Sequence, residues 1–125
     1  MIYLEKRKEL VKILKLNGYI KSKDVEQAFL DTPREQFVPD YIKKYSYFDN
    51  PLEIGNGQTI SAPHMVAIML EALDIKKGQK VLEIGAGSGY HVAVASKLVG
   101  DNGHIYTVER FSNLFEFAKQ NLKKI

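Results

Sequence analysis

The sequence contains no cysteine, and this absence limits what the protein can be. A fold held by disulfide bonds is excluded, as is a metal site with thiolate ligands, and we assign no metal ligands. No apolar run reaches the roughly 18 residues of a membrane-spanning helix. The charged residues 5–9 follow Met1 too closely for a secretory signal. The sequence therefore predicts a soluble cytoplasmic protein without a membrane partner.

A strong excess of one charge is also missing. Eighteen Lys and Arg residues face 15 Asp and Glu residues, which gives a net charge of +3. The basic residues are scattered and mostly lie between apolar positions of the expected helices. A nucleic-acid site concentrates its basic residues on one stretch or face. We therefore interpret these charges as a solvated surface and expect no nucleic-acid partner. The 125 residues, 45% of them hydrophobic, suffice for the core of one ordinary domain.

The first 75 residues contain three segments with helical patterns. Apolar residues at helical spacing predict a helix over 3–16, and Gly18 suits its end. Ser22 is a suitable N-cap for a second helix. Thr32 to Glu35 have the pattern of a capping box, in which a hydroxyl and a carboxylate bind the free amides of a helix start. Residues 38–58 lack periodicity and predict a long irregular segment, and a helix over 62–73 follows.

The remaining residues alternate strands and helices. A short apolar run after Gly78 predicts a buried strand. The expected elements are a strand over 80–84, a turn over 85–89, a helix over 90–99, a strand over 104–109 and a helix over 111–122. This order predicts a parallel pair of strands joined by a right-handed crossover. We divide the chain into an N-terminal helical part with a loop, residues 1–75, and this strand-helix unit, residues 76–125.

The turn contains the most informative pattern in the sequence. Gly85, Gly87 and Gly89 allow a sharp turn and leave space for a ligand beside the backbone. Glu109 ends the next strand about 20 residues later, the offset at which an acidic residue binds ribose hydroxyls. The pattern therefore favours a nucleoside site at the start of the following helix. The alternative is a tight strand-to-helix turn that binds nothing.

The spacing also bears on the cofactor. A dinucleotide fingerprint requires its third glycine at position 90, where this sequence has Tyr90. Gly-x-Gly-x-Gly preceded by Glu83 resembles motif I of the Rossmann-like S-adenosyl-L-methionine-dependent methyltransferases. That resemblance implies that Glu83 lies near the methionine part of the cofactor and that Glu109 binds its ribose. We favour a methyltransferase over a dehydrogenase.

Segments upstream of the turn narrow the resemblance to one family. The string PLEIGNGQTISAPHM at residues 51–65 resembles the signature that protein-L-isoaspartate O-methyltransferases carry before motif I. PREQFVP at residues 33–39 and the strand-turn segment 81–90 are similar to two further family segments. The resemblance covers the chain from about residue 20. It implies the N-terminal part of an α/β, Rossmann-like class I methyltransferase fold, preceded by a helical segment.

The same resemblance implies an activity. Such an enzyme transfers the methyl group of S-adenosyl-L-methionine to the carboxylate of L-isoaspartyl residues in damaged proteins and peptides. The ester then closes to a succinimide, which reopens partly to normal aspartate. By resemblance Thr59, Ile60 and Ser61 line the reaction centre, with Ser61 as the active-site serine. Ser88 matches a cofactor contact, and Arg110 joins Glu109 on the ribose and adenine side.

Two of these residues also have plain structural interpretations. Ser61 precedes Ala62-Pro63 and could simply cap the next helix. His64 belongs to the family pattern, but its place near a helix start favours packing or capping. A methyltransferase with another acceptor and a non-catalytic cofactor-binding module remain alternatives for the whole chain.

Family members continue beyond the motifs found here, so the sequence is expected to be a fragment or a truncated gene product. Two parallel strands alone leave both sheet edges exposed, and this predicts self-association through those edges.

Overall fold

A computed structural model describes residues 2–125. The chain contains the α-helices α1 (Ile2–Leu16), α2 (Lys23–Leu30), α3 (Pro63–Leu73), α4 (Tyr90–Val99) and α5 (Ser112–Leu122). Two 3-10 helices, η1 (Arg34–Phe37) and η2 (Asp40–Tyr45), follow α2. The strands are β1 (Leu52–Gly55), β2 (Gln58–Ile60), β3 (Lys80–Ile84) and β4 (His104–Val108). Among residues 2–125, no helix combines the length and the apolarity that crossing a bilayer requires.

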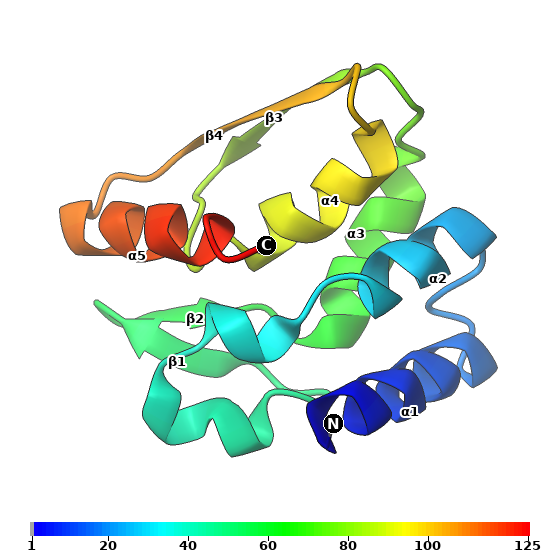
Figure 1. Cartoon of the computed structure of the whole chain (residues 1–125), viewed down its shortest axis with the longest axis horizontal. Coiled ribbons are helices and arrows are strands. Elements are labelled where there is room, and N and C mark those ends of the chain that lie inside the picture. The colour runs from blue at the N-terminus through cyan, green and yellow to red at the C-terminus, as the bar shows by residue number, and fades with distance from the viewer. Residues whose placement is uncertain (1) are drawn as a thin grey trace.

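Strands β3 and β4 form the parallel pair that the sequence predicts, with α4 between them in the chain. In Figure 1 this two-stranded sheet lies along one edge of the molecule, and the helices lie on one side of it. The apolar side chains on its other face are between 50% and 77% exposed: Leu82, Ile84, Tyr106 and Val108. The predicted strand over 80–84 is therefore confirmed, but its predicted burial is wrong. Helices cover only one face of the pair, whereas parallel sheets are normally covered on both.

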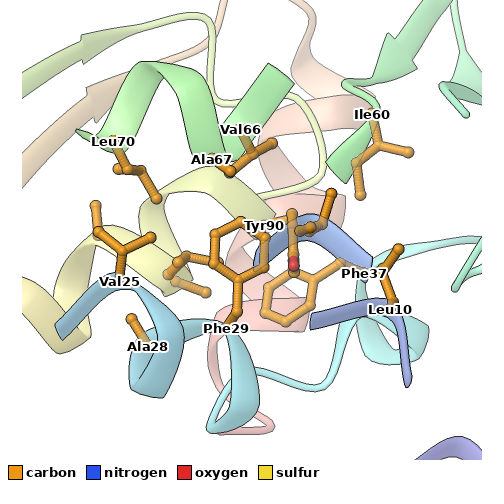
Figure 2. Packing of buried hydrophobic residues seen from close by; sticks show 14 of the residues in the cluster. Leu10, Val25, Ala28, Phe29, Phe37, Ile60, Val66, Ala67, Leu70 and Tyr90 are labelled. Atoms are coloured by element: carbon orange, nitrogen blue, oxygen red, sulfur yellow. The ribbon is translucent and has the colours of Figure 1, made fainter. Parts of the chain in front are cut away.

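The hydrophobic core lies among the helices and includes residues from both halves of the chain. Figure 2 shows Phe29 of α2, Phe37 of η1 and Tyr90 of α4 within this core. The Tyr90 ring meets the other two edge-on, at centroid distances of 6.5 and 5.7 Å. Such aromatic pairs add to the stabilisation that burial alone provides. Because Tyr90 directly follows the glycine turn, the N-terminal helices hold the start of α4 in place.

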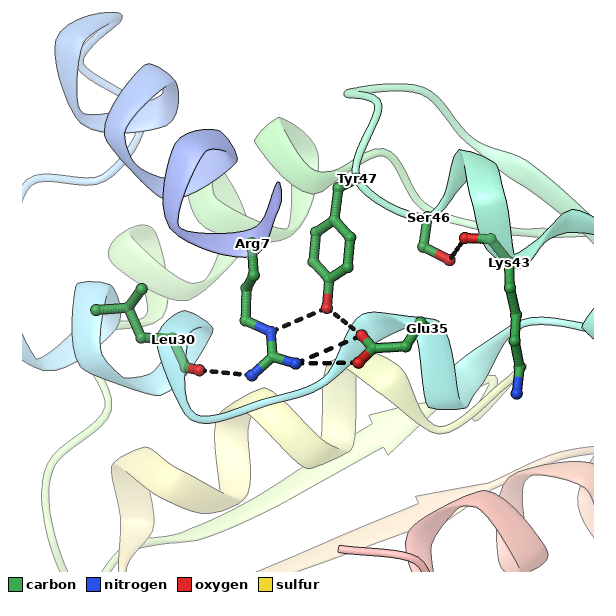
Figure 3. Close-up of polar contacts among 6 residues, drawn as sticks. All are labelled: Arg7, Leu30, Glu35, Lys43, Ser46 and Tyr47. Carbon is green, nitrogen blue, oxygen red and sulfur yellow. Dashed lines mark hydrogen bonds and ion pairs between the residues drawn. The ribbon is translucent and has the colours of Figure 1, made fainter. Parts of the chain in front are cut away.

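A buried polar network joins α1 to η1 and to the segment after η2 (Figure 3). Arg7 Nη2 lies 3.1 Å from Glu35 Oε1, and Arg7 Nε donates to the Tyr47 hydroxyl at 2.9 Å. The Tyr47 hydroxyl in turn donates to Glu35. Arg7 Nη1 donates to the Leu30 carbonyl at 2.9 Å, at the end of α2. Burial and the hydrogen bond to Glu35 raise the pKa of Tyr47 well above its ordinary value, so this hydroxyl remains a donor.

The predicted capping box over 32–35 is wrong. The Thr32 hydroxyl donates backwards to the Ala28 carbonyl of α2 at 2.7 Å, and Glu35 turns to Arg7. Between them Arg34 is fully buried; its Nε donates to the Ser46 carbonyl at 2.8 Å. Each polar group of the expected box therefore has another partner, and the segment continues as the short helix η1.

Other helix boundaries were predicted with mixed success. The N-cap role of Ser22 is confirmed, since its side chain accepts from the Val25 amide at 3.3 Å. The N-cap of α3 is Ala62 and not Ser61, because Pro63 begins the helix and the residue before a proline favours extended backbone. Within the irregular segment expected over 38–58, the sequence missed η2 and the antiparallel β1–β2 hairpin.

Candidate functional site

The glycine turn joins β3 to α4. Gly85, Gly87 and Gly89 all have positive φ, at 92°, 54° and 88°. The Gly85 amide donates to the Val108 carbonyl at 2.8 Å, which fixes the turn to the end of β4. A Cβ on Gly89 would lie 3.3 Å from the Ala118 carbonyl oxygen of α5. The glycines thus provide both the backbone conformation and the close approach of a neighbouring helix.

Glu109 lies beside this turn, at the end of β4. Its carboxylate accepts from the Gly87 amide at 2.9 Å and from the Phe111 amide at 3.0 Å. The hydrogen bond from Phe111, followed by that from Gly87, lowers the pKa of Glu109, so the group stays ionised at neutral pH. A carboxylate has about four acceptor positions, so about two remain for a ligand. Arg110 is exposed, and its guanidinium lies over the Phe111 ring at 4.6 Å.

A cleft of about 400 Å³ extends from the turn towards α3. Its size lies within the range of small-molecule sites. Residues 59–61, at the end of the hairpin, line it together with residues 81–88 of β3 and the turn. The Ser61 side chain is exposed and caps no helix, and among residues 2–125 its hydroxyl has no hydrogen-bond partner. The hydroxyl is therefore free to bind a ligand.

Most of the residues assigned from the sequence meet at this cleft. Those that line it are Thr59, Ile60, Ser61, Glu83, Gly85, Gly87 and Ser88. The other three, Gly89, Glu109 and Arg110, lie outside its lining. Ser88 is buried; its hydroxyl accepts from the Tyr90 amide at 3.3 Å, and its carbonyl accepts from Asn121 at 3.0 Å.

Two histidines occupy different places. His64 lies at the start of α3; its backbone amide and its Nδ1 both contact Asp49 Oδ1, at 2.8 and 2.9 Å. These contacts join α3 to the preceding loop and fit the packing interpretation. His91 of α4 lines the cleft, and sequence reasoning did not assign it. Its position in the sequence, directly after Tyr90 and two residues beyond the glycine turn, is the signal by which it could have been found.

Two solved structures that match this fold are named as methyltransferases. A putative protein-L-isoaspartate O-methyltransferase from Plasmodium falciparum, in complex with S-adenosyl-L-homocysteine, matches with a TM-score of 0.82 and 35% sequence identity. The match covers 94% of this chain and 55% of that one. A second protein-L-isoaspartate O-methyltransferase matches with a TM-score of 0.85 and 38% identity, over 94% of this chain and 38% of that one. The fold is that of the N-terminal part of a Rossmann-like methyltransferase, as predicted.

The family model of protein-L-isoaspartate(D-aspartate) O-methyltransferase (PCMT) matches residues 5–125. The curated protein-L-isoaspartate O-methyltransferases of Ignicoccus hospitalis and Methanosarcina mazei are 54% identical over 121 residues and 58% identical over 125 residues. These matches cover 97% and 96% of this chain. The chain belongs to the protein-L-isoaspartate(D-aspartate) O-methyltransferase family, which confirms the resemblance. It spans about half the length of these relatives, 57% and 51%.

Proposed function

We propose that this chain forms part of an enzyme that transfers the methyl group of S-adenosyl-L-methionine to the carboxylate of L-isoaspartyl residues in damaged proteins. The observation that carries the proposal is the cleft in which Ser61 lies with the glycine turn, more than 20 residues further along the chain. Family membership supports the choice of acceptor. In this proposal residues 1–75 supply the active-site loop and residues 76–125 the cofactor-binding unit.

The described residues fit the chemistry of this cofactor. Its ribose offers two hydroxyl donors, which match the free acceptor positions of Glu109. Its methionine end carries an ammonium group, which the carboxylate of Glu83 attracts. No atom lies within 4 Å of a Cβ built on Gly85, so a ligand can approach the backbone there. The cofactor-binding residues that we propose are Thr59, Ile60, Ser61, Glu83, Gly85, Gly87, Ser88, Gly89, Glu109 and Arg110.

When bound, the cofactor would supply a sulfonium methyl group: a bond from a carboxylate oxygen to the methyl carbon would form in line as the carbon–sulfur bond breaks, and S-adenosyl-L-homocysteine would leave. The substrate carboxylate needs no general base, because its reference pKa near 4 leaves it ionised at neutral pH. What the protein contributes is position, and well-oriented reactants recover roughly 7–11 kcal/mol of the barrier. The free Ser61 hydroxyl donates to one carboxylate oxygen. The positive end of the α3 dipole adds favourable electrostatics near this carboxylate.

The test of this function is a methyl-transfer assay on an isoaspartyl peptide and its aspartyl twin. The protein assayed is this chain extended by the remaining part of the M. mazei relative, with the same protein carrying Ser61→Ala beside it. We expect transfer to the isoaspartyl peptide alone, and we expect Ser61→Ala to lower kcat by tenfold or more, about the effect of one lost oriented hydrogen bond. The affinity for S-adenosyl-L-homocysteine should change much less, because Ser61 is only one of the proposed cofactor contacts and its proposed role is to orient the acceptor. Equal transfer to both peptides would contradict the acceptor, and full turnover of the variant would contradict the role of Ser61.

A second prediction concerns Glu109. Glu109→Ala should weaken S-adenosyl-L-homocysteine binding by about tenfold or more, because the ribose hydroxyls lose their acceptor when they are buried. Isothermal titration calorimetry measures this. Glu116→Ala, which removes an exposed carboxylate from α5, is the matched control and should leave the affinity unchanged. An unaltered affinity in Glu109→Ala would rule out ribose binding by this residue.

A further inference from the structure

Arg34 of η1 is the largest of the fully buried side chains among residues 2–125. Its Nε donates to the Ser46 carbonyl at 2.8 Å and its Nη2 to the Asn50 carbonyl at 3.4 Å. The guanidinium also lies over the ring of Tyr90, with Cζ 4.9 Å from the ring centroid. Its Nη1 is buried without a hydrogen-bond partner, and none of the ion pairs in the described part of the chain includes Arg34. Arg34 thus connects residues 46–50 to the start of α4.

A buried guanidinium without a carboxylate partner is an expensive way to fill this space. Removing a charge from water costs free energy, and the same burial lowers the pKa of Arg34. The two carbonyls and the ring face offset part of this cost. An apolar side chain would fill the same volume without it. What the guanidinium adds is a fixed geometry, because its planar fork holds two carbonyls of one segment beside one ring.

The segment that Arg34 holds, residues 46–50, contains the cap of α3. Asp49 Oδ1 accepts from the His64 amide at 2.8 Å and from His64 Nδ1 at 2.9 Å. Pro63 has no amide hydrogen, so that of His64 is the first in the helix, and the N-cap residue itself makes no side-chain hydrogen bond. The carboxylate also lies at the positive end of the helix dipole. Asp49, 15 positions before His64, therefore attaches the start of α3 to this segment.

Ser61 depends on these neighbours for its position. It follows β2 directly, one residue separates it from α3, and its hydroxyl has no partner among residues 2–125. Residues 46–50 lead into the β1–β2 hairpin and also hold the start of α3, so they bear on Ser61 from both sides. Arg34 in turn holds these residues beside Tyr90, the first residue after the glycine turn. A continuous series of contacts therefore runs from the glycine turn to the two elements that flank Ser61.

We infer that Arg34 and Asp49 are positioning residues for methyl transfer, which together set the place of the Ser61 hydroxyl relative to the glycine turn. This inference rests on the proposed function, in which Ser61 orients the acceptor. Neither Arg34 nor Asp49 lines the cleft, so both act through Ser61. Releasing the segment leaves the glycine turn and its cofactor contacts in place but displaces the hydroxyl. Substitution of either residue should therefore lower turnover far more than cofactor affinity.

The experiment measures methyl transfer to an isoaspartyl peptide, and calorimetric affinity for S-adenosyl-L-homocysteine, in the extended protein used for the methyl-transfer assay. Asp49→Ala should lower kcat about tenfold or more, since a misplacement of about 1 Å can cost on the order of a hundredfold. Its affinity for S-adenosyl-L-homocysteine should stay close to that of the wild type. Asp49→Asn keeps an acceptor oxygen for the His64 amide and should restore most of the wild-type kcat. Asp40→Ala, which removes an exposed carboxylate from η2, is the matched control and should keep the wild-type kcat.

Arg34→Met tests the other end of the series of contacts. It keeps an unbranched side chain but releases both carbonyls, so it should also lower kcat about tenfold or more and leave the affinity nearly unchanged. Combined with Asp49→Ala, it should cost little more than either change alone, because both release the same segment.

Full turnover of Asp49→Ala would overturn the inference, as would an Asp49→Asn variant that is no better than Asp49→Ala. Equal losses of turnover and affinity in Asp49→Ala would do the same, because they would show a merely structural role. Loss of S-adenosyl-L-homocysteine binding in Arg34→Met would overturn the role of Arg34, which would then serve folding alone. All of these results would leave the proposed function standing. A wild-type protein that transfers no methyl group would overturn the proposed function and the inference with it.

Discussion

Replacing Glu35 with alanine lowers the free energy of unfolding by about 3–5 kcal/mol, the usual effect of removing one partner from a buried ion pair. The side chains of Arg7 and Glu35 are only 12% and 9% exposed. Glu35→Ala leaves the Arg7 guanidinium buried without its counter-ion. It also removes the acceptor of the Tyr47 hydroxyl, which burial keeps protonated. Two groups are thus left with unmade interactions, and this explains the size of the expected effect.

A double-mutant cycle separates the pair from its surroundings. Arg7→Met combined with Glu35→Met removes both charges and keeps apolar volume, so it should cost much less than either single change. Urea denaturation measures all four proteins, each in the extended form used for the methyl-transfer assay, so that the transition is cooperative. Glu26→Ala is the control, because Glu26 pairs with Lys15 at 2.8 Å in a more exposed setting and should cost about 1 kcal/mol or less. A double variant as unstable as the worse single variant would show that packing, and not charge, makes the network important.

The strand-turn-helix unit could be predicted from sequence because its signals are local. The strand over 80–84, the turn over 85–89 and the helix over 90–99 are all in place, and the second strand and last helix differ from prediction by one residue. Apolar periodicity and glycine each act within a few residues of where they occur. The gathering of Ser61 and the turn in one cleft could not be derived from such local rules. The prediction that Ser61 lies near the turn came from the family resemblance, because the two segments meet only through tertiary packing.

The errors have a common physical cause. In the expected capping box, the Thr32 hydroxyl donates back into the preceding helix, and Glu35 pairs with Arg7, 28 positions away. Hydrogen-bonding groups in such a segment bind whichever partner the fold provides, so a local motif is only one possibility among several. The β1–β2 hairpin was missed for a similar reason: two strands of four and three residues are too short for an alternating pattern to stand out. His91 was missed because its partner Glu83 lies on another element.

The uncovered face of the β3–β4 pair should make the isolated chain self-associate or pack loosely. This apolar face is formed by Leu82, Ile84, Tyr106 and Val108. Sheets usually contain about 4–6 strands, and a pair alone is marginally stable. Both edges of this pair also carry unpaired backbone groups, which favour pairing with another chain. The curated relatives are about twice as long, so an extended protein has material to cover this surface.

Light scattering and melting curves test this expectation. We expect the wild-type chain to be oligomeric, or to melt broadly and bind a hydrophobic dye, and to show at most weak methyl transfer. Leu82→Lys with Tyr106→Lys places charges on the apolar face and should shift the chain towards the monomer, since desolvating a lysine opposes burial of the face. Leu16→Lys, at an exposed leucine at the end of α1, is the matched control and should not. A wild-type monomer with a sharp cooperative melt and full activity would contradict the prediction. It would show that the exposed apolar face of the β3–β4 pair neither drives association nor loosens the packing.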